Sequence, residues 1–407
     1  MNKFKIIWYR VFQFCFYKAS RLLPWRRPVK LEGAGCVTEL PMVVKRFGIN
    51  RVLLVTDRML RQLNLTATLE KALDAADIGY TVFDNVEANP TVDMVEHARE
   101  AYLNSNCEGF IAFGGGSVID TAKAASARVA KPHTSIERMG GFLKVIKKLP
   151  PVFAVATTAG TGSEVTVAAV VTNSRTHHKY ALSDPSLIPV CAVLDPEIIV
   201  GLPPAVTAET GMDALAHAVE AYITWTVTKR VRLMCEEAVS LIFANIRTAY
   251  ENGRDLKARQ SMLRAAFLAG DSFSRSGLTY NHAIAHTLSG LYNETHGRAN
   301  AVLLPYVLEA FGESVYAKLA RLAVVSGLKV SGMDDKQAAM VFIQAVKQLN
   351  KDLGLPETFQ MIRKQDVPQM AKWALAEANP WYPVPKVFGI KEITDIIGRV
   401  IQKETSL

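Results

Sequence analysis

Four side chains that could bind a divalent metal ion lie in two short segments, at spacings that suit a shared site. Asp213 and His217 are four positions apart in a stretch, 211–220, with a helical pattern, so both project from one face of the helix. His282 and His296 follow further along the chain. Three imidazoles and a carboxylate suit Fe²⁺ or Zn²⁺ and leave room for a substrate oxygen. A lone helical histidine is more often packed or solvated, but several at this spacing favour a metal site.

The remaining histidines and two nearby acidic residues have less certain roles. His286 repeats the four-residue spacing after His282 and is a fifth candidate ligand. Glu209 and Glu220 are candidates to hydrogen-bond the ligands, although either also suits a solvated helix face. The other four histidines are expected to be solvated: His97, His133, His177 and His178.

A glycine-rich turn is predicted between a buried strand, 109–113, and a helix that contains Asp120. The turn comprises residues 114–117, three glycines followed by Ser117. Without Cβ atoms, such a turn can bring backbone N–H groups against a pyrophosphate at the helix N-terminus. A tight strand-to-helix turn without any ligand is the alternative interpretation.

Two further features favour a dinucleotide. A polar loop, 157–166, follows the predicted strand 152–156 and supplies hydroxyl groups and flexible backbone beside the glycine turn. Asp57, at the end of the first predicted strand, is placed to accept hydrogen bonds from a ribose and to repel a 2'-phosphate. A helix N-cap is an equally good interpretation of Asp57, because aspartate is a preferred capping residue.

The elements that must position these residues fall into two regions. Between about residues 50 and 200, short β-branched runs alternate with helical segments, as in βαβ units with a mainly parallel sheet. The predicted strands are 52–56, 80–83, 109–113, 152–156 and 191–194, and the predicted helices are 65–76, 92–104 and 117–129. After Leu202 the apolar spacing becomes helical, in 214–222, 232–250 and 258–273.

This pattern predicts an α/β N-terminal Rossmann-like parallel-sheet domain followed by an all-α C-terminal domain. The expected boundaries are a basic aromatic extension at 1–30, a dinucleotide-binding α/β domain at 31–204 and an all-helical metal-binding domain at 205–407. We find no internal repeat or low-complexity linker, so we expect the two domains to pack closely and leave a cleft.

Composition narrows the class of protein. The 407 residues are 49% hydrophobic and 21% charged, as in a soluble globular protein. The net charge is +9, but eight positive charges precede the first acidic residue, Glu32, which leaves +1 for the rest. A nearly neutral body argues against nucleic-acid binding. Five scattered cysteines without a CxxC pair argue against a disulfide framework and favour a reducing cytoplasm.

Residues 1–28 form a separate problem. Arg10, Gln13 and Lys18 interrupt the apolar runs, so the segment lacks the core of a signal peptide and the length of a membrane span. Its aromatic and aliphatic residues recur at roughly helical intervals beside basic ones, which suits a helix at an anionic membrane interface. The alternative is a segment that packs on its own domain or on a partner subunit.

Taken in order, these motifs resemble the iron-containing, group III alcohol dehydrogenase family, which shares its fold with dehydroquinate synthase and glycerol dehydrogenase. The resemblance runs from about Leu31 to the C-terminus. It rests on the patterns at 55–57, 89–91, 114–117, 157–162, 211–217 and 282–296. Residues 287–295 depart from the family pattern, as do the polar side chains of Glu294, Thr295 and Arg298, and the first thirty residues have no counterpart in typical members.

The resemblance implies roles for individual residues. The metal ligands would be Asp213, His217, His282 and His296, and His286 would be a non-ligand histidine near the nicotinamide. Asp57 would select NAD, Asn89 would lie near the adenosine and Lys179 would approach the nicotinamide ribose. The whole cofactor-binding set would be Asp57, Asn89, Gly115, Gly116, Ser117, Asp120, Thr157, Thr158, Thr161, Thr166 and Lys179.

The combined interpretation is a metal-dependent NAD(H) alcohol dehydrogenase or aldehyde reductase, with iron expected and zinc or another divalent ion as the alternative. A metal lowers the pKa of a bound alcohol so that hydride can pass to the nicotinamide. His286 would relay the proton or serve only a structural role. The expected partners are a small alcohol or aldehyde and a second copy in a homodimer, without nucleic acid. The expected location is cytoplasmic, and peripheral membrane contact through residues 1–28 stays open.

Two rival functions keep parts of this interpretation. A dehydroquinate synthase-like lyase also combines NAD with a metal, but its phosphate-bearing substrate would need a cluster of lysines and arginines at the metal cleft, which the sequence does not indicate. A non-catalytic, membrane-associated binding protein is the second rival. The intact ligand set and both polar glycine loops count against it.

Overall fold

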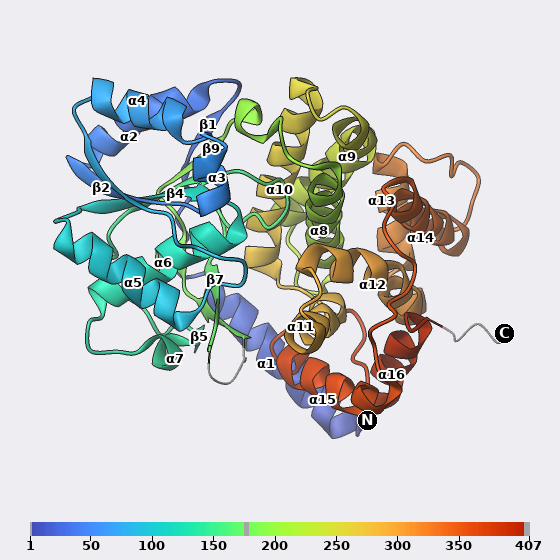
Figure 1. The fold of residues 1–407 in the computed structure, drawn as a ribbon. Coiled ribbons are helices and arrows are strands. Elements are labelled where there is room, and N and C mark those ends of the chain that lie inside the picture. The colour runs from blue at the N-terminus through green and yellow to red at the C-terminus, as the bar shows by residue number, and fades with distance from the viewer. Residues whose placement is uncertain (1, 175–178, 403–407) are drawn as a thin grey trace. The chain divides into compact units, whose positions relative to one another are not determined.

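The computed structural model describes residues 2–174 and 179–402. The chain forms two compact units. The α/β unit comprises Pro24–Leu202 with Gly253–Gly270, and the helical unit comprises Met1–Leu23, Pro203–Asn252 and Asp271–Leu407. Figure 1 shows the fold as a ribbon whose colour runs from blue at the N-terminus to red at the C-terminus.

A parallel six-stranded sheet is the centre of the α/β unit (Figure 1). Its strand order is β1-β9-β6-β4-β2-β3, and every pair of neighbours is parallel. The strands are β1 (Val29–Glu32), β2 (Arg51–Val55), β3 (Gly79–Phe83), β4 (Gly109–Gly114), β6 (Val152–Ala156) and β9 (Cys191–Leu194). The inner strands β4, β6 and β9 are buried along their whole length, which is why they consist of unbroken apolar runs rather than alternating patterns.

Helices cover both faces of this sheet, α5 and α6 on one and α2 and α4 on the other (Figure 1). The helices are α2 (Leu40–Arg46), α3 (Arg58–Gln62), α4 (Ala67–Ala75), α5 (Val92–Asn104), α6 (Gly116–Ala130) and α7 (Ile136–Met139). A small second sheet has the order β5-β8-β7, with β5 at Gly141–Phe142, β7 at Ala168–Thr172 and β8 at Lys179–Ser183.

In the helical unit, α8 (Pro204–Ile223) packs against α9 (Lys229–Glu251) and α12 (His296–Phe311). Residues 211–223 of α8 are all buried. The other helices are α1 (Lys3–Ser20), α10 (Leu256–Ser276, whose first part belongs to the α/β unit), α11 (Tyr280–Tyr292), α13 (Tyr316–Val325), α14 (Asp335–Asp352), α15 (Val367–Ala378) and α16 (Ile390–Arg399).

The predicted fold class is confirmed, since a parallel sheet domain is followed by a mostly helical region. All five predicted strands and the helices predicted at 65–76, 92–104 and 117–129 are present within a few residues of their expected bounds. The helical stretches predicted at 214–222, 232–250 and 258–273 lie inside α8, α9 and α10. Four strands were not predicted, namely β1, β5, β7 and β8. The division of the chain into domains at 1–30, 31–204 and 205–407 remains a prediction. Among the described residues, no helix combines the length and apolar character needed to cross a bilayer.

Candidate metal centre and cofactor loops

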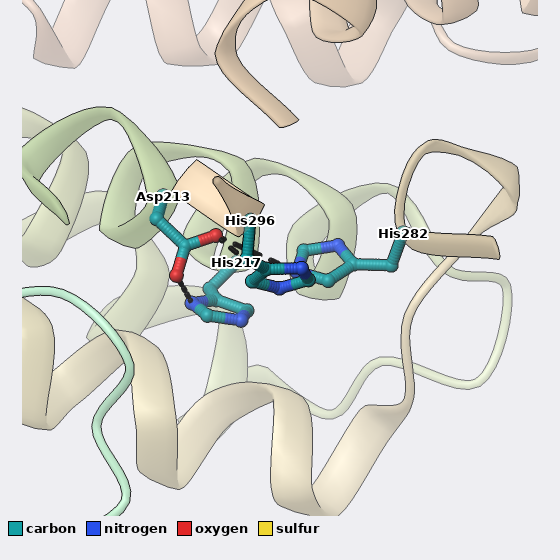
Figure 2. Close-up of side chains that lie close together, drawn as sticks. All are labelled: Asp213, His217, His282 and His296. Carbon is teal, nitrogen blue, oxygen red and sulfur yellow. Dashed lines mark ion pairs between the residues drawn. The ribbon is translucent and has the colours of Figure 1, made fainter. Parts of the chain in front are cut away.

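Three helices of the helical unit bring the four predicted metal ligands together. Asp213 and His217 come from successive turns of α8, His282 from the first turn of α11, and His296 is the first residue of α12. Figure 2 shows the Asp213 carboxylate facing the three imidazoles. The candidate ligand atoms all lie within 4.8 Å of one another. Asp213 and His217 therefore share one face of α8, as their four-residue spacing predicted. The two histidines from α11 and α12 complete the cluster.

The distances suit a small cation. Asp213 Oδ1 lies 3.8 Å from His282 Nε2 and 3.7 Å from His296 Nε2, and Asp213 Oδ2 lies 3.9 Å from His217 Nδ1. Ligands about 2.1 Å from a tetrahedral metal are separated by about 3.4 Å, so small side-chain movements would close the shell. His217 Nδ1 is buried and has no hydrogen-bond partner among the described residues. Such an atom needs a partner, and a metal ion would provide one.

A fifth residue, Asn300 of α12, lies at the centre of the cluster. Its Nδ2 atom lies 2.8 Å from Asp213 Oδ1, 3.1 Å from His282 Nε2 and 3.0 Å from His296 Nε2. An amide nitrogen carries only two protons, so it can donate to only two of these three acceptors at once. The convergence of three acceptors on one NH₂ donor group, whose hydrogens carry positive partial charge, indicates that these side chains are arranged for a positive charge.

Burial sets the protonation states of this cluster. Desolvation lowers the pKa of His282 and of His296 well below the ordinary value, so both rings are neutral near pH 7. For Asp213, burial alone would raise the pKa, but the surrounding histidines and Asn300 outweigh burial and lower it. An ionised carboxylate beside imidazoles with free lone pairs is the form that binds a metal ion.

Glu220, one turn beyond His217 on α8, orients His282. The carboxylate is completely buried and contacts His282 Nδ1 through Oε2, while Oε1 accepts hydrogen bonds from the backbone N–H and the hydroxyl of Thr279. As an acceptor, Glu220 keeps the proton on Nδ1 and leaves the Nε2 lone pair facing Asp213. Burial raises the pKa of Glu220 to about 7. Glu209 has a different partner, because it binds Arg298 at 2.7 Å.

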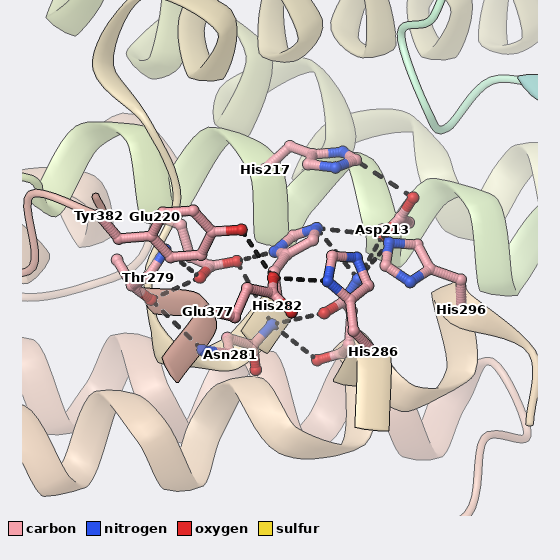
Figure 3. Close-up of polar contacts among 11 residues, drawn as sticks. Asp213, His217, Glu220, Thr279, Asn281, His282, His286, His296, Glu377 and Tyr382 are labelled. Atoms are coloured by element: carbon pink, nitrogen blue, oxygen red, sulfur yellow. Dashed lines mark hydrogen bonds and ion pairs between the residues drawn. The ribbon is translucent and has the colours of Figure 1, made fainter. Parts of the chain in front are cut away.

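His286 belongs to a second hydrogen-bonded group beside the metal ligands (Figure 3). Its Nδ1 lies 2.7 Å from Glu377 Oε1 of α15, and the Tyr382 hydroxyl donates to the same oxygen at 2.7 Å. Its ring stacks on His296 with centroids 5.1 Å apart. Burial, followed by the nearby Glu377 charge, raises the pKa of Tyr382 well above its usual value, so Tyr382 remains a donor. The imidazole of His286 is therefore held at the edge of the cluster with its Nδ1 engaged.

In the α/β unit, the predicted cofactor residues gather at one edge of the sheet. Asp57 follows β2, Gly115 to Ser117 follow β4, and Thr157 and Thr158 follow β6. These strands are parallel neighbours, so their carboxyl ends meet at the same edge, where ligands of open α/β sheets bind. Asn89 follows β3 in a left-handed conformation with φ 61°, and Lys179 begins β8.

The glycine turn and the threonine loop approach each other closely. A Cβ atom on Gly116 would lie 2.9 Å from Thr161 Cγ2, so only glycine leaves this space open. Gly115 caps α6 without any side-chain hydrogen bond, which leaves the first N–H groups of α6 available to an anion. Gly162 has φ +63°, and its Cα faces Gly270 of α10. The loop geometry fits a pyrophosphate lying across the start of α6.

Three predicted cofactor residues already hold other partners. Asp57 is the N-cap of α3, accepting the Leu60 N–H at 2.9 Å. Asp120 accepts from the Ser163 hydroxyl and, at 2.9 Å, from the Val170 N–H. Thr166 accepts a hydrogen bond from the buried Lys123. These contacts support the loop from within, and they leave the direct cofactor roles of the three residues as predictions.

Lys123 was missed by sequence reasoning. Its ammonium group is completely buried and lies within hydrogen-bond distance of four oxygens, Ser163 Oγ at 3.1 Å, the carbonyl and hydroxyl of Thr166 at 3.0 Å each, and Ala168 O at 2.9 Å. Its three N–H groups can bond three of them at once. Desolvation lowers the pKa of Lys123 to about 8. One lysine on α6 thus fastens the threonine loop to the helix that follows the glycine turn.

The remaining histidines have simpler outcomes. His97 and His133 are exposed, as expected for solvated residues. The prediction for His177 and His178 concerns residues outside those that the structure describes. Of the site residues that sequence reasoning missed, Asn300 and Glu377 carried no local signal, because each reaches the cluster only through packing of distant helices.

Comparison with known proteins decides the family. The pattern of the iron-containing alcohol dehydrogenases matches residues 29–196, and that of the Fe-containing alcohol dehydrogenase family, C-terminal, matches residues 207–401. The chain belongs to the iron-containing alcohol dehydrogenase family. It is therefore an oxidoreductase that interconverts alcohols and aldehydes with NAD and iron, as the resemblance predicted.

Individual relatives cover most of the chain. Lactaldehyde reductase of Escherichia coli (strain K12) is 36% identical over 84% of this chain and 90% of its own length. The 1,3-propanediol dehydrogenase of Citrobacter freundii is 36% identical over 90% of this chain and 96% of its own length. A crystal structure of 1,3-propanediol oxidoreductase matches with a TM-score of 0.90 at 34% identity, covering 93% of this chain and 100% of that one. The matches to both family patterns begin after α1.

Proposed function

We propose that this alcohol dehydrogenase acts on small aldehydes and alcohols, and that Asp213, His217, His282 and His296 hold its iron. The convergence of the four ligand atoms on a centre with an unsatisfied buried nitrogen, His217 Nδ1, carries the proposal. The substrate class is supported by the relatives, which are named for lactaldehyde and 1,3-propanediol. The choice among such compounds would depend on residues 287–295 and Arg298, which depart from the family pattern.

A bound ion would act as a Lewis acid toward the substrate oxygen, and the chain supplies the remaining functions. His286 is the candidate proton carrier, because its ring stacks on His296 and its Nδ1 is fixed by Glu377. With Nδ1 bonded to Glu377, Nε2 is the nitrogen that would exchange the proton. Glu377 and Tyr382 serve as positioning residues, since Glu377 contacts His286 and the Tyr382 hydroxyl holds Glu377.

The cofactor roles follow from the sheet edge. The N-terminus of α6, at Gly115, Gly116 and Ser117, would bind the pyrophosphate. Thr157, Thr158 and Thr161 would line the site, and Asn89 and Lys179 would contact the adenosine and the nicotinamide ribose. Asp57 caps α3 through Oδ1, and its negative charge at the strand end supports selection of NAD over NADP.

The cellular setting is part of the proposal. A homodimer in the cytoplasm fits the family expectation, and β1, an edge strand with a partner on only one side, offers a surface for pairing with a second copy. Light scattering of the purified protein tests the dimer. Peripheral membrane contact through residues 1–28 is argued separately below, from the surface of α1.

The proposed metal site is tested with His282→Ala against His97→Ala. His282 is buried among the ligands and His97 is exposed in the α/β unit. After anaerobic loading with Fe²⁺, the first variant should retain no stoichiometric iron and lose turnover, whereas the second should match the parent protein. Stoichiometric iron in the first variant would remove His282 from the site.

The reaction class is tested by the fate of the cofactor. A dehydrogenase converts one NAD⁺ to NADH for each alcohol oxidised, whereas the rival lyase returns its cofactor unchanged. Anaerobic Fe²⁺-loaded protein should therefore form NADH with small alcohols such as propane-1,3-diol. Tyr382→Phe, which removes only the hydroxyl that holds Glu377, should lower kcat several-fold and leave KM nearly unchanged. An altered KM with normal kcat would contradict the positioning role.

A further inference from the structure

The N-terminal helix α1 has two different faces, and its inner face is fastened to the helical unit. Gln13 is completely buried, and its amide donates to the carbonyls of Pro380, at 3.0 Å, and Tyr382, at 2.7 Å. The same side chain accepts the Trp225 indole N–H at 2.8 Å. A buried polar group with three hydrogen bonds resists detachment. The helix is therefore a fixed part of this unit, and the predicted packing of the segment on its own domain is present.

Other contacts strengthen this attachment. Arg10 donates to the carbonyls of Val384, at 2.7 Å, and Pro385, at 2.9 Å. Phe12 and Phe16 meet the Trp381 ring edge-on, with centroids 5.0 and 5.7 Å apart. Figure 1 shows α1 running beside α15. Because α1 is held along its length, whatever its outer face binds is coupled to the helical unit as a body.

The outer face of α1 is apolar and exposed. It consists of residues spaced as on one side of a helix, with exposed fractions of 81, 58, 55, 56 and 52% for Phe4, Ile7, Trp8, Val11 and Phe14. Ile390, 48% exposed, lines a pocket with Lys5 and Tyr9 beside this stripe. Five large hydrophobic side chains in one stripe mark an interaction surface rather than isolated exposure.

The charges that α1 itself carries have one sign. Lys3, Lys5, Lys18 and Arg21 are exposed along α1 and at its end, and no acidic residue precedes Glu32. Glu392, near the Lys5 end, already accepts the Gly389 N–H. A second copy of the same face would bring like charges together. A partner for this surface must therefore be apolar at its centre and negatively charged at its edge.

We propose that the outer face of α1, residues Phe4, Ile7, Trp8, Val11 and Phe14, docks on the surface of an anionic lipid bilayer. Aromatic and aliphatic side chains would enter the boundary between headgroups and acyl chains, while the flanking lysines and Arg21 contact anionic headgroups. The fixed inner face would hold the helical unit against the membrane. The proposal goes beyond the dehydrogenase reaction and does not depend on the metal site.

Point variants of the outer face test the proposal better than truncation, because removal of α1 would uncover the segment that Gln13 and Arg10 hold. The test variant is Ile7→Ser/Trp8→Ser/Val11→Ser. The matched control is Leu233→Ser/Val324→Ser/Met333→Ser, whose apolar side chains are exposed elsewhere in the helical unit. Unfolding temperature and light scattering report the fold and the oligomeric state of each protein.

Co-sedimentation with vesicles provides the measurement. The parent protein and the control should bind vesicles that contain phosphatidylserine, bind phosphatidylcholine vesicles weakly, and lose several-fold affinity at high salt because exposed charges are screened. The affinity of the test variant for the anionic vesicles should fall by about ten-fold or more. Equal lipid binding by the test variant and the parent would overturn the proposal, as would absent lipid binding by the parent. A reduced oligomer size in the test variant, with unchanged lipid binding, would assign the face to a second copy.

Discussion

Replacing Glu220 with glutamine should weaken metal binding without touching any ligand. Glu220 is completely buried and only accepts, from His282 and the Asn281 amide on one oxygen and from the Thr279 N–H and hydroxyl on the other. Glutamine fits the same space but presents one oxygen and one NH₂ group. Whichever way the amide turns, its NH₂ group faces a donor. If it faces His282, the imidazole must take the tautomer with the proton on Nε2.

In that tautomer, His282 Nε2 carries a proton and has no lone pair for a metal ion. This nitrogen lies 3.8 Å from Asp213 Oδ1. Partners that orient metal-binding histidines typically contribute about 10- to 100-fold in metal affinity, which corresponds to about 1.4 to 2.7 kcal/mol. We expect the loss for Glu220→Gln to fall in this range, because its carboxylate contacts one of the four candidate ligands and not the others. Turnover at saturating iron should fall less than the affinity does.

Competition with a calibrated chelator under anaerobic conditions measures the affinity for Fe²⁺. The matched control is Glu236→Gln, which removes a charge from α9 where Glu236 binds Tyr222 and Arg321, away from the ligands. An affinity for Fe²⁺ equal to that of the parent protein would refute the orienting role of Glu220. An equal loss in both variants would show that the effect reflects charge removal and not the contact with His282.

Three further predictions concern the α/β unit. Asp57→Gly should raise the ratio of kcat/KM for NADP to that for NAD, and an unchanged ratio would leave Asp57 only as the cap of α3. Gly162→Ala should lower the unfolding free energy by about 1–3 kcal/mol, since φ is +63° and the new Cβ would lie 2.7 Å from Gly270 Cα, whereas Gly201→Ala, with open space around it, should change little. Burial raises the pKa of Glu164 to about 7 from 4.5, so the folded state binds more protons between these values and stability falls as pH rises through them. Glu164→Gln should abolish this fall of about 3 kcal/mol, and parallel stability-against-pH curves for the two proteins would disprove the shift.

Much of the fold followed from local patterns. The apolar runs at 52–56, 109–113 and 152–156 predicted strands that are now seen as parallel neighbours, because a strand buried on both faces needs apolar residues throughout. The strands β1 and β8 escaped prediction. Strand β1 alternates apolar with charged residues at an edge of the sheet, so composition alone does not distinguish it from a loop.

In the histidine cluster, too, the sequence determined one part of the arrangement and the packing of helices decided the rest. The four-residue interval between Asp213 and His217 is a property of any helix, so the sequence determined that they share a face. It also supplied His282 and His296 as candidates, and the packing of α8, α11 and α12 brought the ligand atoms within 4.8 Å. Asn300 enters that centre only through this packing, and nothing in its neighbourhood along the chain marks it out.

The N-terminal helix illustrates what only tertiary structure decides. The sequence determined that residues 3–20 carry aromatic side chains and positive charge at helical intervals, and it left membrane contact and packing as alternatives. Because helical periodicity gives the angle between side chains but not the direction of the neighbours, it could not tell which face would be covered. Gln13 donates hydrogen bonds to carbonyls more than 360 residues away in the sequence. Those long-range hydrogen bonds hold the inner face of the helix against the helical unit and leave Phe4, Trp8 and Val11 exposed to solvent.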